Sequence, residues 1–260
     1  MTNYTLKLIT LLVVSVMSLL ICKAQAQVVF DDFTSGDTSG ANIVGSTPVV
    51  GGTTWEGNAG GGPLTYGFTS GGSAEATPYS MYTDGSARTI YAGFTSALGT
   101  GEELALSFNG IDFGGNFPNS GGFAGVSLYT GFTSANPDGS VNGGSEQEFI
   151  GEPFNGNQWG LDGATTGLQD GNNTTVPATA TFTYIFNTGA WTFTTSGGVN
   201  LSGTGVADQA FNAVRIANNN GGDIDLNNLE AVISPVPEPS SLALAGVGVS
   251  LFLSVRRRKP

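Results

Sequence analysis

Short runs of alternating apolar and polar residues, each bounded by glycine, asparagine, serine or proline, constrain the fold of this chain most. The chain holds 41 glycines, which favour tight turns, and between residues 27 and 234 almost no stretch carries the 3.6-residue apolar period of a helix. Alternation with a period of two is typical of a strand that buries one face. The sequence therefore predicts an all-β fold, a single antiparallel β-sandwich over residues 27–234.

Ten segments are predicted strands: Val28–Phe33, Leu64–Phe68, Thr89–Phe94, Glu103–Phe108, Phe123–Tyr129, Gln147–Ile150, Ala178–Phe186, Ala190–Thr195, Asn212–Ala217 and Leu226–Ile233. The clearest feature is an aromatic hairpin. Phe182, Tyr184 and Phe186 alternate with other residues and so share one face. Asn187-Thr188-Gly189 supplies a short turn, and Trp191 and Phe193 return on the partner strand. Cross-strand aromatic pairs of this kind predict a place in the core, with a sugar-stacking platform as the alternative.

The first 26 residues are typical of a secretory signal peptide. Lys7 supplies a positive charge in the N-terminal region of the signal, and Leu8–Ile21 forms its apolar region. A small-x-small pattern then predicts cleavage between Ala26 and Gln27. A lipoprotein is the alternative, because Cys22 follows a leucine-rich run, but the residue before that cysteine is bulky. The signal peptide is therefore the preferred interpretation.

The C-terminal segment, residues 235–260, has three parts in a fixed order. Val236-Pro237-Glu238-Pro239 comes first, the apolar run Leu242–Val255 second, and Arg256-Arg257-Arg258-Lys259 last. The prolines keep the first part extended. As a helix the apolar run is about 21 Å long, short against a hydrocarbon core of about 30 Å, but it can insert with local thinning of the bilayer. The segment therefore predicts a C-terminal transmembrane helix with its basic end in the cytoplasm.

These three parts together resemble the PEP-CTERM sorting signal. The resemblance implies that an exosortase-type membrane peptidase recognises Val236, Pro237, Glu238 and Pro239 and removes the tail nearby. It also implies export through the inner membrane of a Gram-negative bacterium that makes exopolysaccharide. The protein would be anchored transiently and would reach the outer surface or the extracellular matrix. An ordinary C-terminal anchor is the alternative.

Missing residue types exclude several chemistries. Histidine is absent from the chain, and the single cysteine lies in the predicted signal peptide. Ser-His-Asp and Cys-His catalysis, His-ligated zinc and disulfides are therefore excluded for the mature protein. Residues 27–234 hold two basic residues, Arg88 and Arg215, against nineteen acidic ones, a net charge of −17. Such a surface repels phosphate backbones, which excludes nucleic acid, and it suits neutral sugars or divalent cations.

Short motifs spread along the chain point to one fold family: Gly45–Trp55, Phe123–Leu128, Glu146–Gly151, Gln158–Asp162 and Phe211–Ile216. Together they resemble concanavalin A-like, or laminin-G-like, jelly-roll domains. The resemblance implies a jelly roll, flanked here by the signal helix and the transmembrane helix. It assigns no activity, because jelly rolls serve as lectins, enzymes and spacers alike.

Glu146 and Glu148 are the best candidates for a catalytic carboxylate pair. Two positions apart on a strand, they would share a face about 7 Å apart, within the separation that glycosidases use. Glu152 continues the same parity, although Pro153 interrupts the strand. Glycosidases of related fold carry Glu-x-Asp-x-x-Glu, from which this spacing departs. An exposed acidic pair is also an ordinary solvated strand face, so no catalytic residue is assigned.

Two kinds of binding site are candidates. Trp55, Trp159 and Trp191 could each stack on a sugar ring, while burial in the core is the competing expectation for at least two of them. A lectin role predicts that at least one is exposed in a groove. Asp223 and Asp225, in a segment rich in asparagine and glycine, are a candidate calcium site. Turn chemistry explains the same composition.

Two classes of function fit these observations. The first is a non-catalytic exported surface or matrix protein that associates with exopolysaccharide and binds glycan. The second is a carbohydrate-active enzyme, a glycan hydrolase, on the same fold. The missing histidine and the irregular acid spacing favour the first class. The sequence thus predicts no enzyme and no cofactor beyond structural calcium.

Overall fold

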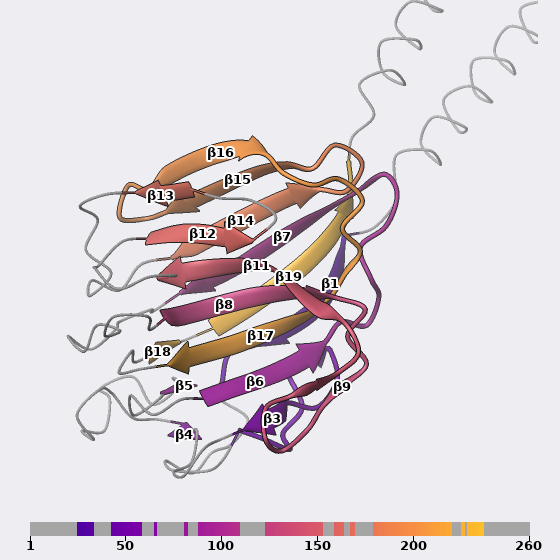
Figure 1. Cartoon of the computed structure of the whole chain (residues 1–260), viewed down its shortest axis with the longest axis vertical. Coiled ribbons are helices and arrows are strands. Elements are labelled where there is room, and N and C mark those ends of the chain that lie inside the picture. The colour runs from indigo at the N-terminus through magenta and orange to yellow at the C-terminus, as the bar shows by residue number, and fades with distance from the viewer. Residues whose placement is uncertain are drawn as a thin grey trace, which may run out of the picture.

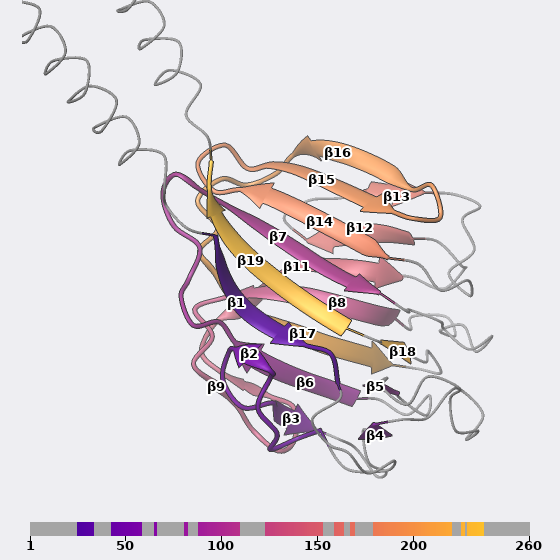
Figure 2. The same ribbon diagram turned by 180° about the vertical axis from the view of Figure 1, so that it is seen from behind.

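The computed structural model describes residues 25–33, 43–58, 65–66, 81–82, 88–109, 123–152, 159–163, 167–169, 179–219, 225–226 and 228–236. Their regular secondary structure is entirely β-strand, and two antiparallel seven-stranded sheets stack face to face (Figures 1 and 2). The predicted all-β jelly-roll sandwich is confirmed. The two predicted terminal helices lie outside the described residues, and no helix within those residues is long and apolar enough to span a membrane.

The first sheet has the strand order β16-β15-β14-β7-β19-β1-β2. Its strands are β1 (Ala26–Asp31), β2 (Val50–Gly51), β7 (Glu102–Asn109), β14 (Ala180–Ile185), β15 (Ala190–Thr195), β16 (Asn200–Thr204) and β19 (Asn228–Pro235). The first and last strands of the sandwich, β1 and β19, are therefore neighbours, and β1 lies next to the edge strand β2.

The second sheet has the order β13-β12-β11-β8-β17-β6-β3. Its strands are β3 (Glu56–Asn58), β6 (Arg88–Gly93), β8 (Phe123–Thr130), β11 (Ser145–Glu152), β12 (Trp159–Gly163), β13 (Gly167–Gln169) and β17 (Phe211–Asn219). The remaining short strands are β4 (Thr65–Tyr66), β5 (Met81–Tyr82), β9 (Ser134–Ala135), β10 (Val141–Asn142) and β18 (Asp225–Leu226).

The core lies between the two sheets and is built from alternating strand residues. In β14 every second residue is buried, and the predicted aromatic hairpin is confirmed: Phe182 pairs with Phe193, and Tyr184 pairs with Trp191. Trp159 of the second sheet packs against Phe193 of the first, with ring centroids 6.1 Å apart. Aromatic contacts across the sandwich therefore join the two layers.

Candidate functional site

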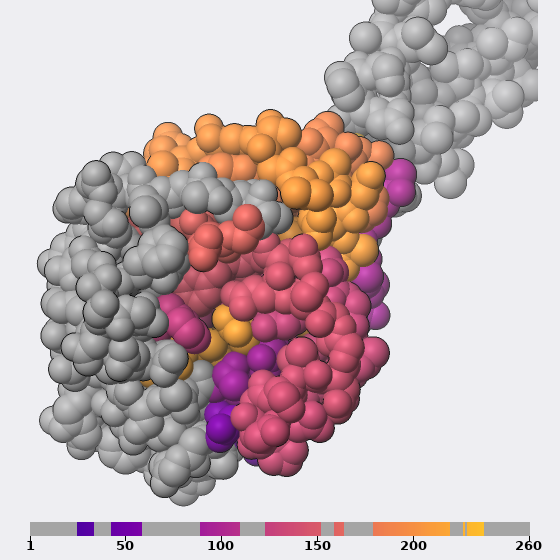
Figure 3. Space-filling model, in the orientation of Figure 1, coloured from indigo at the N-terminus to yellow at the C-terminus, as the bar shows by residue number. Residues whose placement is uncertain are grey.

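The second sheet turns one face to the core and the other, its outer face, away from the first sheet. Strand pairing places one row of residues side by side across six strands of this face: Asp162, Phe149, Ser127, Arg215, Tyr91 and Glu56. Figure 3 views this face and shows it hollowed over β17 and β6, with the β9–β10 hairpin raised beside the hollow. The row therefore lies across a concave surface.

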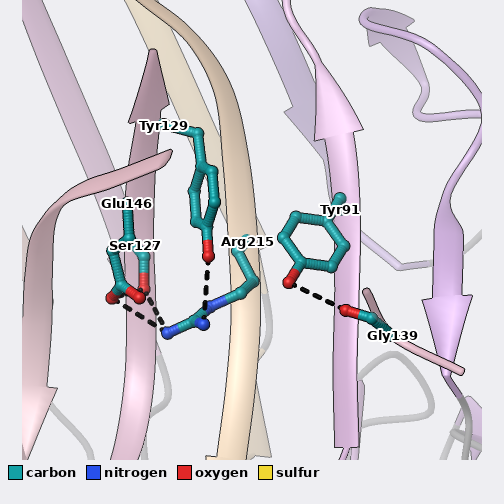
Figure 4. Close-up of polar contacts among 6 residues, drawn as sticks. All are labelled: Tyr91, Ser127, Tyr129, Gly139, Glu146 and Arg215. Atoms are coloured by element: carbon teal, nitrogen blue, oxygen red, sulfur yellow. Dashed lines mark hydrogen bonds and ion pairs between the residues drawn. The ribbon is translucent and has the colours of Figure 1, made fainter. Parts of the chain in front are cut away.

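Arg215 is the centre of a polar network on the outer face (Figure 4). Its Nη1 donates to the Tyr129 hydroxyl at 3.2 Å, and its Nη2 donates to Ser127 Oγ at 3.0 Å and to Glu146 Oε1 at 2.9 Å. Ser127 Oγ in turn donates to Glu146 Oε1 at 2.8 Å. Three strands, β8, β11 and β17, supply these four side chains. The network neutralises one carboxylate and holds the guanidinium in place.

Two aromatic rings flank the Arg215 guanidinium. Its central carbon lies 5.7 Å from the ring centroid of Phe123 and 5.6 Å from that of Tyr129. Phe123 also meets Phe149 edge to face, with centroids 5.6 Å apart. The Arg215 side chain is 13% exposed and that of Glu146 is 32% exposed. The Arg215 guanidinium is therefore mostly covered by neighbouring side chains, whereas Glu146 keeps part of its surface open to solvent.

A second aromatic cluster borders the network. Tyr91 stacks on Phe132 at 5.5 Å and meets Tyr129 edge to face at 5.3 Å. The Tyr91 hydroxyl donates to the carbonyl of Gly139, and Glu56 Oε2 accepts from the backbone N–H of Ala135 at 2.7 Å. These contacts hold the β9–β10 hairpin against the outer face.

The tyrosine in the network stays protonated. Burial raises the pKa of Tyr129 far above its ordinary value, and the nearby charge of Arg215 opposes that rise only in part. The hydroxyl therefore remains a neutral hydrogen-bonding group, with no basic form available near neutral pH.

The predicted carboxylate pair is not brought together. The register of β11 against β8 shifts between Glu146 and Glu148, which marks a β-bulge at Gln147. Glu146 stays on the outer face, whereas Glu148 pairs with the core residue Leu128 and is fully buried. The prediction that the two glutamates share a face is wrong, because the bulge reverses the alternation. The Glu152 side chain lies outside the described set.

The three candidate tryptophans are all in the interior. Trp55, Trp159 and Trp191 are 0%, 2% and 7% exposed. Trp159 packs between the two sheets, and the ring of Trp191 covers Gly203, where an added Cβ would lie 2.8 Å from Cζ2. Burial in the core, the competing expectation, is confirmed for all three tryptophans. The exposure that a lectin role predicts for at least one of them is therefore not found at these residues.

Trp55 instead lies beside a buried carboxylate, that of Asp31, which the alternation patterns did not predict. Its indole N–H donates to Asp31 Oδ2 at 2.7 Å, and Asp31 Oδ1 accepts the backbone N–H of Phe33 at 2.8 Å. Burial raises the pKa of Asp31 to about 6, although both hydrogen bonds act to lower it. Phe33 has a φ of 53°, in the left-handed region, which fits a turn closed by an aspartate side chain.

The calcium, cleavage and sorting residues are described only in part. Asp223 and the side chain of Asp225 lie outside the described residues, within which no group of three or more acidic side chains could hold a metal ion. Ala26 and Gln27 are the first two residues of β1. Val236 ends the described chain, and Pro237, Glu238 and Pro239 lie beyond it. The calcium and cleavage assignments stay predictions.

The loop Asn136–Ser140, which is also rich in side-chain oxygens, uses them to form a turn. Asp138 Oδ1 accepts hydrogen bonds from the backbone N–H of Ser140 at 2.9 Å and from its hydroxyl at 2.6 Å. These two bonds hold the pKa of Asp138 below its usual range. The composition of this loop is explained by turn chemistry.

Comparison with protein families decides the identity of the C-terminal segment. A model described as the PEP-CTERM protein-sorting motif matches residues 235–259. The chain carries a PEP-CTERM sorting motif. Such a motif implies export and processing by an exosortase, a membrane protein. The PEP-CTERM match begins at Pro235, which is the last residue of β19.

A search of curated protein sequences found no significant match. Among solved structures, the globular domain of T. cruzi calreticulin aligns at 12% identity and a TM-score of 0.42, covering 64% of this chain and 76% of that one. A legume lectin-like domain from Entamoeba histolytica aligns at 12% and 0.42, covering 61% and 84%. Alginate lyase AlyC3 in complex with dimannuronate aligns at 7% and 0.41, covering 61% and 75%. Similarity at this level transfers neither a ligand nor an activity.

Proposed function

We propose that this protein is an exported surface or matrix protein of a Gram-negative bacterium, sorted through its PEP-CTERM motif by an exosortase-type peptidase. Its sandwich binds neutral glycan of the surrounding exopolysaccharide on the outer face of the second sheet, without catalysis. The observation that carries the glycan-binding part is the Arg215 network, which lies in a concave surface with aromatic rings on either side.

The chemistry of this face suits a sugar. A pyranose ring offers an apolar face and a rim of hydroxyls, and aromatic rings beside hydrogen-bonding groups match both. Phe123 is only half-buried, and Glu146 keeps carboxylate surface open to solvent. The net charge of −17 on residues 27–234 opposes the approach of an anionic polymer. A neutral glycan is therefore the proposed ligand.

The proposed carboxylate pair for glycan hydrolysis is absent from this face. Glu148 lies on the core side of β11, so Glu146 cannot work with it on a bond held at the outer face. Glycosidases need two carboxylates on opposite sides of the scissile bond. This geometry argues against hydrolysis by the pair Glu146 and Glu148.

The test measures the affinity of the processed protein, purified from the exporting host, for the exopolysaccharide of that host and for neutral and uronate oligosaccharides. Phe123→Ala and Glu146→Gln should each raise the Kd about tenfold, which corresponds to ~1.4 kcal/mol. Thr194→Ala is the control, because Thr194 is exposed on the first sheet, and its Kd should match the wild type.

Thermal unfolding of each variant separates loss of binding from loss of fold. Folded Phe123→Ala protein that binds glycan as tightly as the wild type would contradict the proposed site. Shortened glycan products after incubation with the wild type would contradict the non-catalytic role.

A further inference from the structure

The two ends of the sandwich fold leave it at one place. Ala26 of β1 pairs with Ile233 of β19, so β1 begins where β19 ends (Figures 1 and 2). The turns at residues 99–101 and 187–189 lie at the same end, joined by a 2.6 Å hydrogen bond from the Gly101 N–H to Asn187 Oδ1. We call this end of the sandwich the base.

The start of the sorting motif is part of the fold at the base. Pro235 pairs with Glu102 of β7, and the Val236 N–H donates to the Gly101 carbonyl at 2.9 Å. Backbone N–H groups point alternately to the two sides of an antiparallel strand. The Val236 N–H points toward β7, so an N–H at position 235 would point to the other side, beyond the first residue of β1. Proline has no N–H and therefore fits at position 235. The PEP-CTERM match covers residues 235–259, so its first two residues are held by the sheet.

Little chain separates the base from the membrane segment. Residues 237–241 lie between Val236 and the apolar run that starts at Leu242. Fully extended, the six residue steps from Val236 to Leu242 span at most about 21 Å. The base must therefore stay within about that distance of the apolar run, and Pro237-Glu238-Pro239 lies in the gap.

We propose that the base is the surface that meets the membrane peptidase, and that pairing of β19 with β7 slows removal of the tail. A peptidase that takes an extended substrate needs backbone N–H and C=O groups that are free to pair with it. Directly before Pro237, the backbone groups are already paired: Ser234 pairs with Glu103 of β7, and the Val236 N–H donates to the Gly101 carbonyl. Tail removal then requires the last residues of β19 to detach from β7. This inference rests on the proposed sorting function.

The experiment adds free chain without changing the motif or the tail. A Gly-Ser-Gly-Ser-Val insertion between Val236 and Pro237, which keeps a valine directly before Pro237-Glu238-Pro239, should speed tail removal about tenfold in the native host, measured by pulse-chase with intact-mass detection. The control carries the same insertion between Gly197 and Gly198, in the exposed β15–β16 turn at the opposite end of the sandwich, and should process at the wild-type rate. Asn187→Ala, which frees the Gly101 turn, should also speed tail removal.

The outcomes separate this inference from the proposed function. A rate that is unchanged or slower after the insertion at Val236 overturns the inference, while sorting itself stands. A wild-type protein that keeps its tail in a host with an active exosortase overturns the proposed sorting, and the inference with it.

Discussion

Among single residues, Asp31 best illustrates how the fold sets a protonation state. Its carboxyl is fully buried, and burial raises its pKa to about 6 from 3.8. The folded protein therefore holds this proton more tightly than the unfolded chain does. The contribution of Asp31 to stability is fully present below about pH 4 and declines by about 3 kcal/mol as the pH rises to about 6.

The hydrogen bond from Trp55 limits that decline, which gives a test. Trp55→Phe should lower the free energy of unfolding by about 2–4 kcal/mol through lost packing and a lost donor. The loss should be larger at pH 8 than at pH 4.5, because only the ionised carboxylate needs the indole N–H as a charge-assisted partner. Urea unfolding at both pH values measures it.

Trp191→Phe is the matched control for that test, because the Trp191 ring packs on Gly203. Its loss of stability should be the same at the two pH values. A loss in Trp55→Phe that is equally independent of pH would refute the assigned role of the Asp31 hydrogen bond.

At the scale of strands, alternation predicted most elements and failed where a strand is irregular. All ten predicted strands overlap observed ones, and Ala190–Thr195 coincides with β15. Six short strands of two or three residues were not predicted: β2, β3, β5, β9, β10 and β13. Of the longer strands, alternation did not predict β16, which is polar and exposed at a sheet edge, or β12, whose first three residues are all buried. Neither strand shows the alternation that identifies a half-buried strand.

The bulge in β11 is a second limit of the alternation rule. The two-residue period of a regular strand places Glu146 and Glu148 on one face. The extra residue Gln147 in the bulge turns their side chains to opposite faces. A bulge is a feature of pairing between two strands, so nothing local in the Glu-Gln-Glu segment predicts it.

Close approach of β8 and β11 gives a prediction at this scale. A Cβ at Gly125 would lie 2.4 Å from the Ile150 carbonyl oxygen and 2.8 Å from Phe149 Cζ. Gly125→Ala should therefore cost about 1–3 kcal/mol of unfolding free energy. Gly197→Ala, whose nearest neighbour is Thr195 Oγ1 at 3.5 Å, should stay within ~0.5 kcal/mol of wild type. Equal stabilities in denaturant unfolding would contradict this packing.

At the scale of the whole molecule, sequence reasoning located the C-terminal signal better than the candidate binding site. The C-terminal signal is local, so its order of motif, apolar run and basic cluster could be read directly, and the family match confirms it. The Arg215 network joins residues far apart in the chain: 86 residues separate Arg215 from Tyr129, and 69 separate it from Glu146. Only the strand order of the second sheet brings them together, and single-sequence patterns carry no information on that order.

The most direct test of the proposed glycan site follows the Arg215 side chain itself. Residues 27–234 contain only two arginines, Arg88 and Arg215, so the Nε–H signals of the processed, ¹⁵N-labelled protein can be assigned with an Arg88→Lys variant. On titration with oligosaccharides from the exopolysaccharide of the host, we expect the Arg215 Nε–H signal to shift and saturate together with binding. Binding that saturates while this signal stays in place would contradict glycan recognition at the outer face.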